Sequence, residues 1–239
     1  MTGSRTTLGP VRILCIDTSG GSAVALVDVP EEGGTTVLSA ASGEDPRRHA
    51  ESLSPLVAEV LGGGTFDAVA VGTGPAPFTG LRVGLVTAQV LARGRGVPVH
   101  GVSTLDVLAR QGLDGLPAGE EVLVVTDARR KEVYWGRYVA DGPDDVRRLA
   151  GPAVAAPATL DPAGATVLGP GAARYPELLV AAPGTPASVD PAVLARVVRA
   201  RLARRVAGAE VELGTEPLYL RRPDVHPAGT PKRATAPAP

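Results

Sequence analysis

The chain is poor in several residue types on which common protein classes depend. Its 239 residues include one cysteine, Cys15, which excludes an internal disulfide and favours a reducing compartment. Aromatic residues make up only 3%, so the core must be aliphatic. No run approaches the roughly 20 apolar residues that a membrane span needs, and the first ten residues lack the apolar segment of a signal peptide. These absences predict a soluble, cytoplasmic protein.

The sequence also lacks the patterns of common catalytic and metal sites. Its net charge is −1, which gives no overall attraction to nucleic acid or anionic membranes. His49, His100 and His226 are far apart and show no paired spacing on one helix. A Gly-x-Ser-x-Gly motif is missing, and no Ser–His–Asp or Cys–His set can be assembled from the spacing. We therefore predict neither a metal site nor a catalytic nucleophile.

What the sequence does contain is organised around a strand, a loop and a helix at residues 66–93. We predict a buried strand at residues 68–71, a tight Gly/Pro loop at 72–78 and a helix from 79 that ends at 94. Small residues recur at every fourth position of this helix, namely Gly80, Gly84, Ala88 and Ala92. Each mid-helix glycine costs about 1 kcal/mol relative to alanine, so another element is expected to approach closely there. That element belongs either to the chain's own core or to a partner.

The first half predicts an α/β unit of known topology. Three strands at residues 11–17, 22–29 and 35–41, joined by short turns, indicate an antiparallel meander. A helix at 45–61, the strand–loop–helix, a strand at 97–102 and a helix at 103–110 follow. The order β-β-β-α-β-α-β-α is similar to the ribonuclease-H-like half-unit of the actin, hexokinase and Hsp70 superfamily.

The second half repeats this opening and then loses regularity. After a linker at 111–119, strands are expected at 121–127, 132–139 and 146–150, a loop at 152–162, a short strand at 165–168, a short helix at 172–180 and a long helix at 190–206. We expect two ribonuclease-H-like domains with mixed sheets and flanking helices, the N-terminal one at 1–110 and a reduced C-terminal one at 111–223. Residues 224–239 form a Pro/Ala-rich tail that is expected to be disordered.

Two glycine-containing turns could contact a nucleotide. Asp17, Thr18 and Ser19 end the first strand, where hydroxyl groups suit phosphate and a carboxylate suits Mg²⁺ through water. Gly72 and Gly74 lie in a second loop, which opens a helix, and helix N-termini favour anions. A plain structural turn remains the alternative for both, so these five residues are a candidate vestigial nucleotide site.

Arginines gather on the helix near the C-terminus and at one hairpin. The helix carries Arg196, Arg199, Arg201, Arg204 and Arg205. A solvated face with favourable charge at the helix C-terminus is preferred over contact with RNA phosphates. The hairpin turn with Arg129, Arg130 and Lys131 allows the same two interpretations.

Several motifs together resemble the bacterial TsaB family, also called YeaZ. They are ILCIDTSGGSAVAL at residues 13–26, RRHAESLSPLV at 47–57, VGTGPAPFTGLRVG at 71–84, GVSTLDVLA at 101–109, TDARRKEVY at 126–134 and PLYLR at 217–221. The family usually has Gly-Ser where this chain has Ala76-Pro77, which should stiffen the loop. The resemblance implies a non-catalytic scaffold that binds and activates TsaD, together with TsaE, in making threonylcarbamoyladenosine in tRNA.

The resemblance also implies an interface and a missing active site. Helices at 47–61 and 79–93 should pack on TsaD as a bundle, with a homodimer competing through the same surface when TsaD is absent. The implied interface residues are His49, Leu53, Leu56, Val60, Gly80, Arg82, Gly84, Leu85 and Ala88. TsaD carries an HxxxH metal pair where this chain has Val102 and Asp106, so no catalysis is expected here. No cofactor is required, weak ATP or ADP binding at the subunit interface is left open, and tRNA is reached indirectly.

Two other functions are compatible with the same sequence. An ATP-dependent phosphotransferase or ATPase could be built on this fold and would turn over ATP by itself. A peptidase, a label attached to this superfamily, lacks a metal pair and a nucleophile set and is the least favoured.

Overall fold

The computed structural model describes residues 9–30, 34–43 and 49–221, with side chains omitted for 49–51. The predicted start of the first helix at residues 45–46, the lead-in at 1–8 and the tail at 224–239 lie outside these residues. No helix in the described ranges is long and apolar enough to cross a membrane.

The first sheet has the predicted topology. Its order is β3-β2-β1-β4-β5, formed by β1 (Val11–Asp17), β2 (Ser22–Val29), β3 (Thr36–Gly43), β4 (Ala68–Gly72) and β5 (Val99–Val102). β1 pairs antiparallel with β2 and parallel with β4. Ile13 and Cys15 enter one core and Leu14 and Ile16 enter another, so β1 is buried on both faces. Cys15 is fully buried, as predicted for a core residue, and burial raises the pKa of its thiol.

The second sheet is smaller and mixed, in the order β8-β7-β6-β9. It contains β6 (Glu121–Asp127), β7 (Val133–Asp141), β8 (Asp145–Ala155) and β9 (Thr166–Leu168). β8 runs through Pro152 into the predicted loop, because an edge strand tolerates a missing N–H donor. The prediction of a helix at 172–180 is wrong, because only the short 3-10 helix η2 (Ala172–Arg174) forms there. Pro176 follows Tyr175 and disfavours helical backbone at that position.

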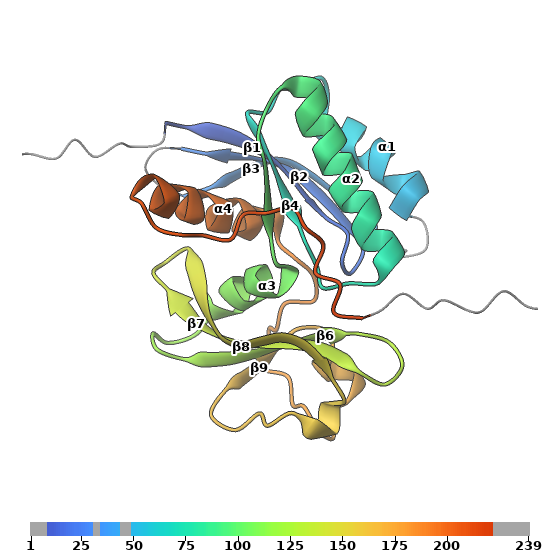
Figure 1. The fold of residues 1–239 in the computed structure, drawn as a ribbon, viewed down its shortest axis with the longest axis vertical. Coiled ribbons are helices and arrows are strands. Elements are labelled where there is room, and N and C mark those ends of the chain that lie inside the picture. The colour runs from blue at the N-terminus through green and yellow to red at the C-terminus, as the bar shows by residue number, and fades with distance from the viewer. Residues whose placement is uncertain (1–8, 31–33, 44–48, 222–239) are drawn as a thin grey trace, which may run out of the picture.

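The helices do not stay with the sheet of their own sequence half (Figure 1). α1 (His49–Leu61) and α2 (Phe78–Arg95) cover one face of the first sheet, and α4 (Pro191–Val206) from the second half covers the other. α3 (Thr104–Leu113) packs on the second sheet and on α4, and it extends beyond its predicted end into the predicted linker.

One hydrophobic core therefore joins the two sheets. It combines Ile13 of β1, Leu105 of α3, Val124 of β6 and Val197 of α4. The α/β class with mixed sheets and flanking helices is confirmed. The limits 1–110 and 111–223 match the two sheets but not the helices that cover them, and the division into two domains stays a prediction.

The small-residue stripe of α2 faces the chain's own core. Gly84, Ala88 and Ala92 are buried among residues of the first sheet. A Cβ atom at Gly84 would overlap the Thr18 side chain, so the turn after β1 is the element that requires a glycine. The helix ends at Gly96, in the left-handed conformation, and not at Gly94 as predicted.

Two glycines of α2 should therefore respond in opposite ways to alanine. Gly84→Ala should lower the free energy of unfolding by about 1–3 kcal/mol, because the added methyl group has no room beside Thr18. Gly94→Ala is the matched control: nothing lies within 4 Å of the position that its Cβ atom would take, and the change should raise stability by about 0.5–1 kcal/mol. Urea denaturation of both variants tests this, and equal shifts would contradict the packing of α2.

Candidate functional site

The turn after β1 is closed by hydrogen bonds within the chain. Asp17 is only 5% exposed. Its Oδ1 accepts the Ser19 backbone N–H at 2.9 Å, and its Oδ2 accepts the Thr104 hydroxyl at 2.8 Å. The Thr18 hydroxyl donates to the Gly80 carbonyl at 2.9 Å, which connects the turn to α2. The side chains proposed for phosphate or Mg²⁺ are therefore engaged with their own chain.

The two predicted nucleotide loops are brought together only in part. Gly72 lies against the Asp17 carboxylate, and a Cβ atom there would overlap it. The Gly74 carbonyl accepts the Thr104 backbone N–H at 2.7 Å and the Ser103 hydroxyl at 3.2 Å. Asp17, Thr104 and Gly72 thus pack closely together and connect β1, β4 and α3. Nucleotide binding by these loops stays a prediction.

The Asp17 carboxyl should make stability depend on pH. Burial raises its pKa, against the opposing effect of the hydrogen bonds from Ser19 and Thr104. The folded state therefore keeps a proton that the unfolded chain releases above its usual pKa of about 3.9, and the free energy of unfolding falls as pH rises through the folded-state pKa.

Asp17→Asn, which cannot titrate, should gain stability relative to the parent protein as pH rises to 7. Below about pH 4 the two proteins should have the same free energy of unfolding, because the parent's Asp17 is then protonated in both states. Thermal unfolding across this pH range measures the effect, and a constant difference at all pH values would contradict it.

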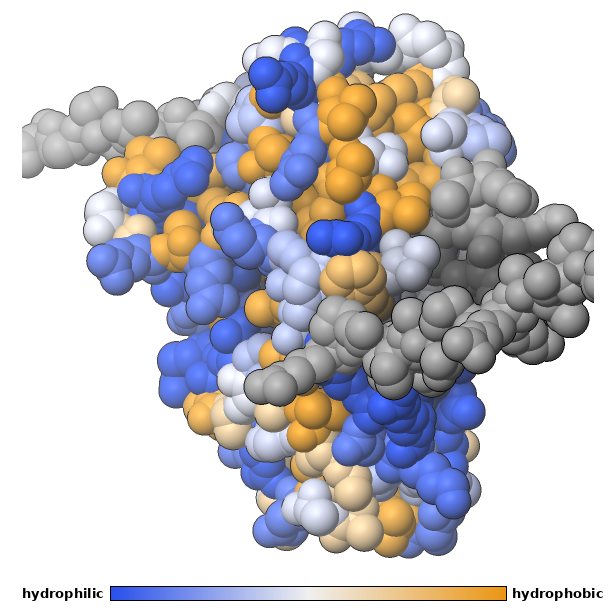
Figure 2. All heavy atoms as spheres, turned by 45° about the vertical axis from the view of Figure 1, so that its right-hand side comes forward, coloured by the Kyte–Doolittle hydropathy of each residue, from blue (hydrophilic) through white to orange (hydrophobic). Residues whose placement is uncertain are grey.

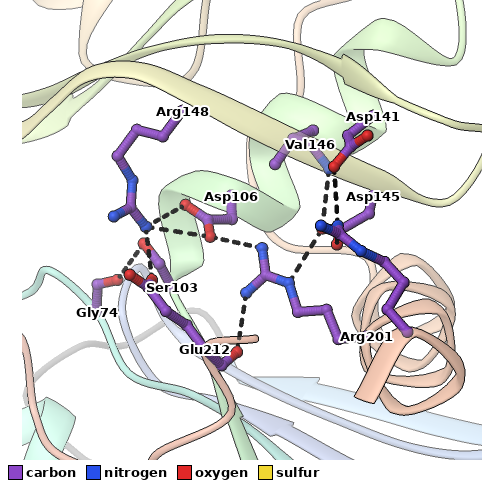
Figure 3. Close-up of polar contacts among 10 residues, drawn as sticks. Gly74, Ser103, Asp106, Asp141, Asp145, Val146, Arg148, Arg201 and Glu212 are labelled. Atoms are coloured by element: carbon purple, nitrogen blue, oxygen red, sulfur yellow. Dashed lines mark hydrogen bonds and ion pairs between the residues drawn. The ribbon is translucent and has the colours of Figure 1, made fainter. Parts of the chain in front are cut away.

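Buried ion pairs connect α3, β8 and α4 (Figure 3). Arg201 donates to Asp106 at 2.8 Å and to Asp145 at 3.0 Å, and each of these three residues is at most 6% exposed. Arg148 also donates to Asp106, at 3.1 Å, and Arg204 donates to Asp145 at 2.9 Å. Both oxygens of Asp106 are therefore taken up by guanidinium groups.

These contacts correct the interpretation of the arginine-rich helix. Arg201 is buried instead of lying on a solvated face, and Arg204 and Arg196 bind carboxylates of the second half. Sequence reasoning missed the network because its acids come from α3, β7, β8 and the adjoining loops, which are distant from α4 in the sequence. The sequence did contain one signal, a cluster of aspartates at residues 141–145. Buried acidic side chains need cationic partners, and the arginines of α4 could supply them.

Arg201→Met should lower the free energy of unfolding by about 3–5 kcal/mol, because it leaves two buried carboxylates without their shared cation. Arg204→Met should cost less, because its side chain is 44% exposed. Chemical denaturation of the two variants measures both effects. A larger loss for Arg204→Met would show that the buried pairs are not the dominant contact.

A basic cleft lies where three of the sequence motifs meet. It is a hollow of about 150 Å³ formed by the loop before α2, the β6–β7 turn and the segment 217–221. Its lining residues are Ala76, Pro77, Phe78, Ala128, Arg129, Arg130, Tyr134, Tyr219, Leu220 and Arg221. The C-terminal segment reaches the loop through a hydrogen bond from the Leu218 N–H to the Thr73 carbonyl, at 2.9 Å.

An aromatic pair and a strained turn line the cleft. The rings of Phe78 and Tyr219 stack with centroids 4.8 Å apart. Arg82 lies over the Phe78 ring at 4.3 Å and donates to the Tyr219 hydroxyl at 3.0 Å. On the other side, the residues at 129–131 all have positive φ, of 64°, 51° and 61°. This conformation costs about 1–2 kcal/mol for each residue that is not glycine, and such strain is common at functional sites.

The predicted partner interface needs correction. Five of its residues belong to the chain's own core: Leu53, Val60, Gly84, Leu85 and Ala88. Leu56 and Gly80 are half-buried, Arg82 lies at the cleft, and the side chain of His49 is outside the described residues. The pattern was misread because α2 turns its small residues inward, where its own sheet and Thr18 approach closely.

The exposed side of α2 instead carries larger apolar residues. Val86 and Val90, one helical turn apart, are 56% and 63% exposed. Hydrophobic side chains gather over this helix in Figure 2. Large exposed apolar patches mark surfaces that bind other proteins. Val86 and Val90 are therefore the residues whose substitution tests an interface.

Comparison with known proteins identifies related sequences along most of the chain. The sequence model described as TsaD, tRNA N6-adenosine threonylcarbamoyltransferase, matches residues 41–176. An uncharacterized protein of Mycobacterium tuberculosis is 37% identical over 220 residues, which cover 90% of this chain and 94% of that protein. The tRNA threonylcarbamoyladenosine biosynthesis protein TsaB of Escherichia coli is 43% identical over 101 residues, 40% of this chain and 43% of that protein.

A solved structure is similar to most of the chain. YeaZ from Pseudomonas aeruginosa superposes with a TM-score of 0.70 at 30% identity, covering 88% of this chain and all of that one.

Proposed function

Because the chain belongs to the TsaB/YeaZ family, we propose that it is a non-catalytic scaffold in threonylcarbamoyladenosine biosynthesis. Its role is to bind and activate TsaD, together with TsaE, in the cytoplasm. TsaD then transfers the threonylcarbamoyl group to N6 of the adenosine next to the tRNA anticodon. The observation that carries the proposal is the exposed apolar side of α2, a surface suited to another protein chain.

The proposed interface follows α2 and the neighbouring α1. Val86 and Val90 stand out from the helix, while Val83 and Leu56 are half-buried at the edge of the core beneath them. An apolar centre with a polar border is the usual anatomy of a specific interface. The same surface can pair two copies of this chain, so a homodimer competes with the heterodimer when TsaD is absent.

The contacts of Asp106 support a non-catalytic role. At the position where TsaD carries a metal-binding histidine, this carboxylate accepts hydrogen bonds from Arg148 and Arg201. Val102, at the other histidine position, is buried and offers no ligand atom. Two guanidinium groups on the carboxylate oppose binding of a metal cation at this place.

An ATPase or phosphotransferase is the second candidate. It is supported only by the fold and by the position of Asp17, and the hydroxyl groups around that carboxylate are engaged within the chain. Titration calorimetry with ATP and Mg²⁺, followed by an assay for phosphate release, distinguishes the candidates. Turnover by the isolated chain would contradict the scaffold role.

The double variant Val86→Glu/Val90→Glu should weaken TsaD binding. Charges at the centre of an apolar interface should cost about 2 kcal/mol or more, which is roughly a thirty-fold rise in Kd. Val180→Glu is the control, because Val180 is 77% exposed and lies in the second half of the chain. Its Kd should be unchanged. Surface plasmon resonance with immobilised TsaD measures both values.

The same variants are tested in a tRNA modification reaction reconstituted from TsaD, TsaE and unmodified tRNA. The double variant should lower tRNA modification to the level seen when this chain is omitted, and Val180→Glu should support full modification. Full modification without the chain would refute the proposed function, and tight TsaD binding by the double variant would refute the interface.

A further inference from the structure

We infer that the basic cleft binds RNA directly, holding one nucleotide of a strand with its phosphate between the β6–β7 turn and the start of α2. The inference deepens the proposed function, on which it rests for the identity of the RNA as tRNA. It differs from the expectation that tRNA is reached only through TsaD.

Cations dominate the cleft and its border although the whole chain has a net charge of −1. The cationic side chains there are Arg82, Arg129, Arg130, Lys131, Arg174 and Arg221. Arg129 and Arg174 pair with Asp127, and Arg221 pairs with Glu132. The positive excess is local, and such a basic site attracts a polyanion whatever the overall charge.

The first turn of α2 adds a second attraction for anions. Pro77 occupies the N-cap position, where it supplies no side-chain acceptor, and the first turn contains no acidic residue. The backbone N–H groups at the start of this 18-residue helix therefore have no capping side chain, and Phe78, its first residue, lines the cleft. Such N-termini are ready sites for phosphate.

Tyr134 supplies a hydrogen-bond donor to the cleft. Its side chain lines the cleft and is only 3% exposed. Among the residues that the structure describes, none forms a hydrogen bond with its hydroxyl. Burial, and then the charge of Asp127, raise its pKa, so the hydroxyl is a proton donor at neutral pH. Because this hydroxyl is not among the described buried atoms that lack a partner, it opens to the cleft, where it can donate to a phosphate oxygen.

The size of the cleft favours one group of a large partner. Pockets that enclose a whole small ligand usually measure about 300–1,000 Å³, and this hollow has about 150 Å³. Phe78 and Tyr219 are 36% and 38% exposed. Aromatic rings beside guanidinium groups suit an unpaired base and its phosphate. A carboxylate of an acidic peptide would use the cations but not the rings.

The first test separates binding from folding. Tyr134→Phe removes only the hydroxyl, so the thermal stability should be equal or higher while the Kd for tRNA rises several-fold. Binding is measured by fluorescence anisotropy with labelled, unmodified tRNA and the complex of this chain with TsaD. An unchanged Kd would argue against the cleft as the RNA site.

The second test removes charge. Arg129→Ser/Arg130→Ser in the same complex should raise the Kd about ten-fold and reduce the slope of log K against log salt by roughly 1–2. Arg147→Ser/Arg205→Ser is the control, because it removes two exposed arginines that lie outside the cleft lining. It should change neither value. Equal effects of the two double variants would overturn the inference.

Two further measurements identify the ligand and separate this inference from the scaffold role. Labelled polyglutamate should bind far more weakly than tRNA, and tighter binding of the peptide that depends on Arg129 and Arg130 would overturn the inference in favour of an acidic protein segment. The cleft variants should keep normal affinity for TsaD, whereas Val86→Glu/Val90→Glu should lose it. Failure of the RNA inference therefore leaves the partner interface intact, and failure of the interface leaves RNA binding by this chain measurable.

Discussion

The guanidinium of Arg201, held between the buried carboxylates of Asp106 and Asp145, is the contact on which the arrangement of the halves depends. It connects α4 to α3 and to β8, so a helix from the end of the chain stays beneath the first sheet. Apolar contacts of α4 supply much of the shared core, while the ion pairs select the position in which no buried charge is left alone. The shared core and the ion pairs together hold α4 on the first sheet and α3 on the second.

The return of the chain after α4 assembles the surface features. The Gly101 N–H donates to the Leu213 carbonyl, and the Leu218 N–H donates to the Thr73 carbonyl, so the C-terminal segment runs along the first half. It places Tyr219 against Phe78 and completes the lining of the basic cleft. The cleft and the apolar side of α2 begin at the same loop but use different residues, so the RNA site and the partner interface that we propose do not overlap.

The helix α2 shows how far a sequence pattern can be interpreted. Its regular small residues correctly indicate close packing. The spacing does not say which element approaches, because a glycine at Gly84 serves a partner helix or the Thr18 turn equally well. Burial decides the matter: Ala88 is wholly enclosed and Val90 is exposed. Val86 and Val90 lie outside the small-residue stripe. Valines are common in core helices, so their presence in the sequence did not indicate an exposed apolar surface.

The sequence by itself determined the strand order of the first sheet, the repeat of that opening in the second half, and membership of the family, because these follow from local periodicity and contiguous motifs. Only the tertiary structure decided which sheet each helix covers, which carboxylates bind the arginines of α4, and which side of α2 stays free. Each of these depends on groups far apart in the chain. A pattern of residue types records that a side chain needs a partner, whereas the folded chain selects the partner.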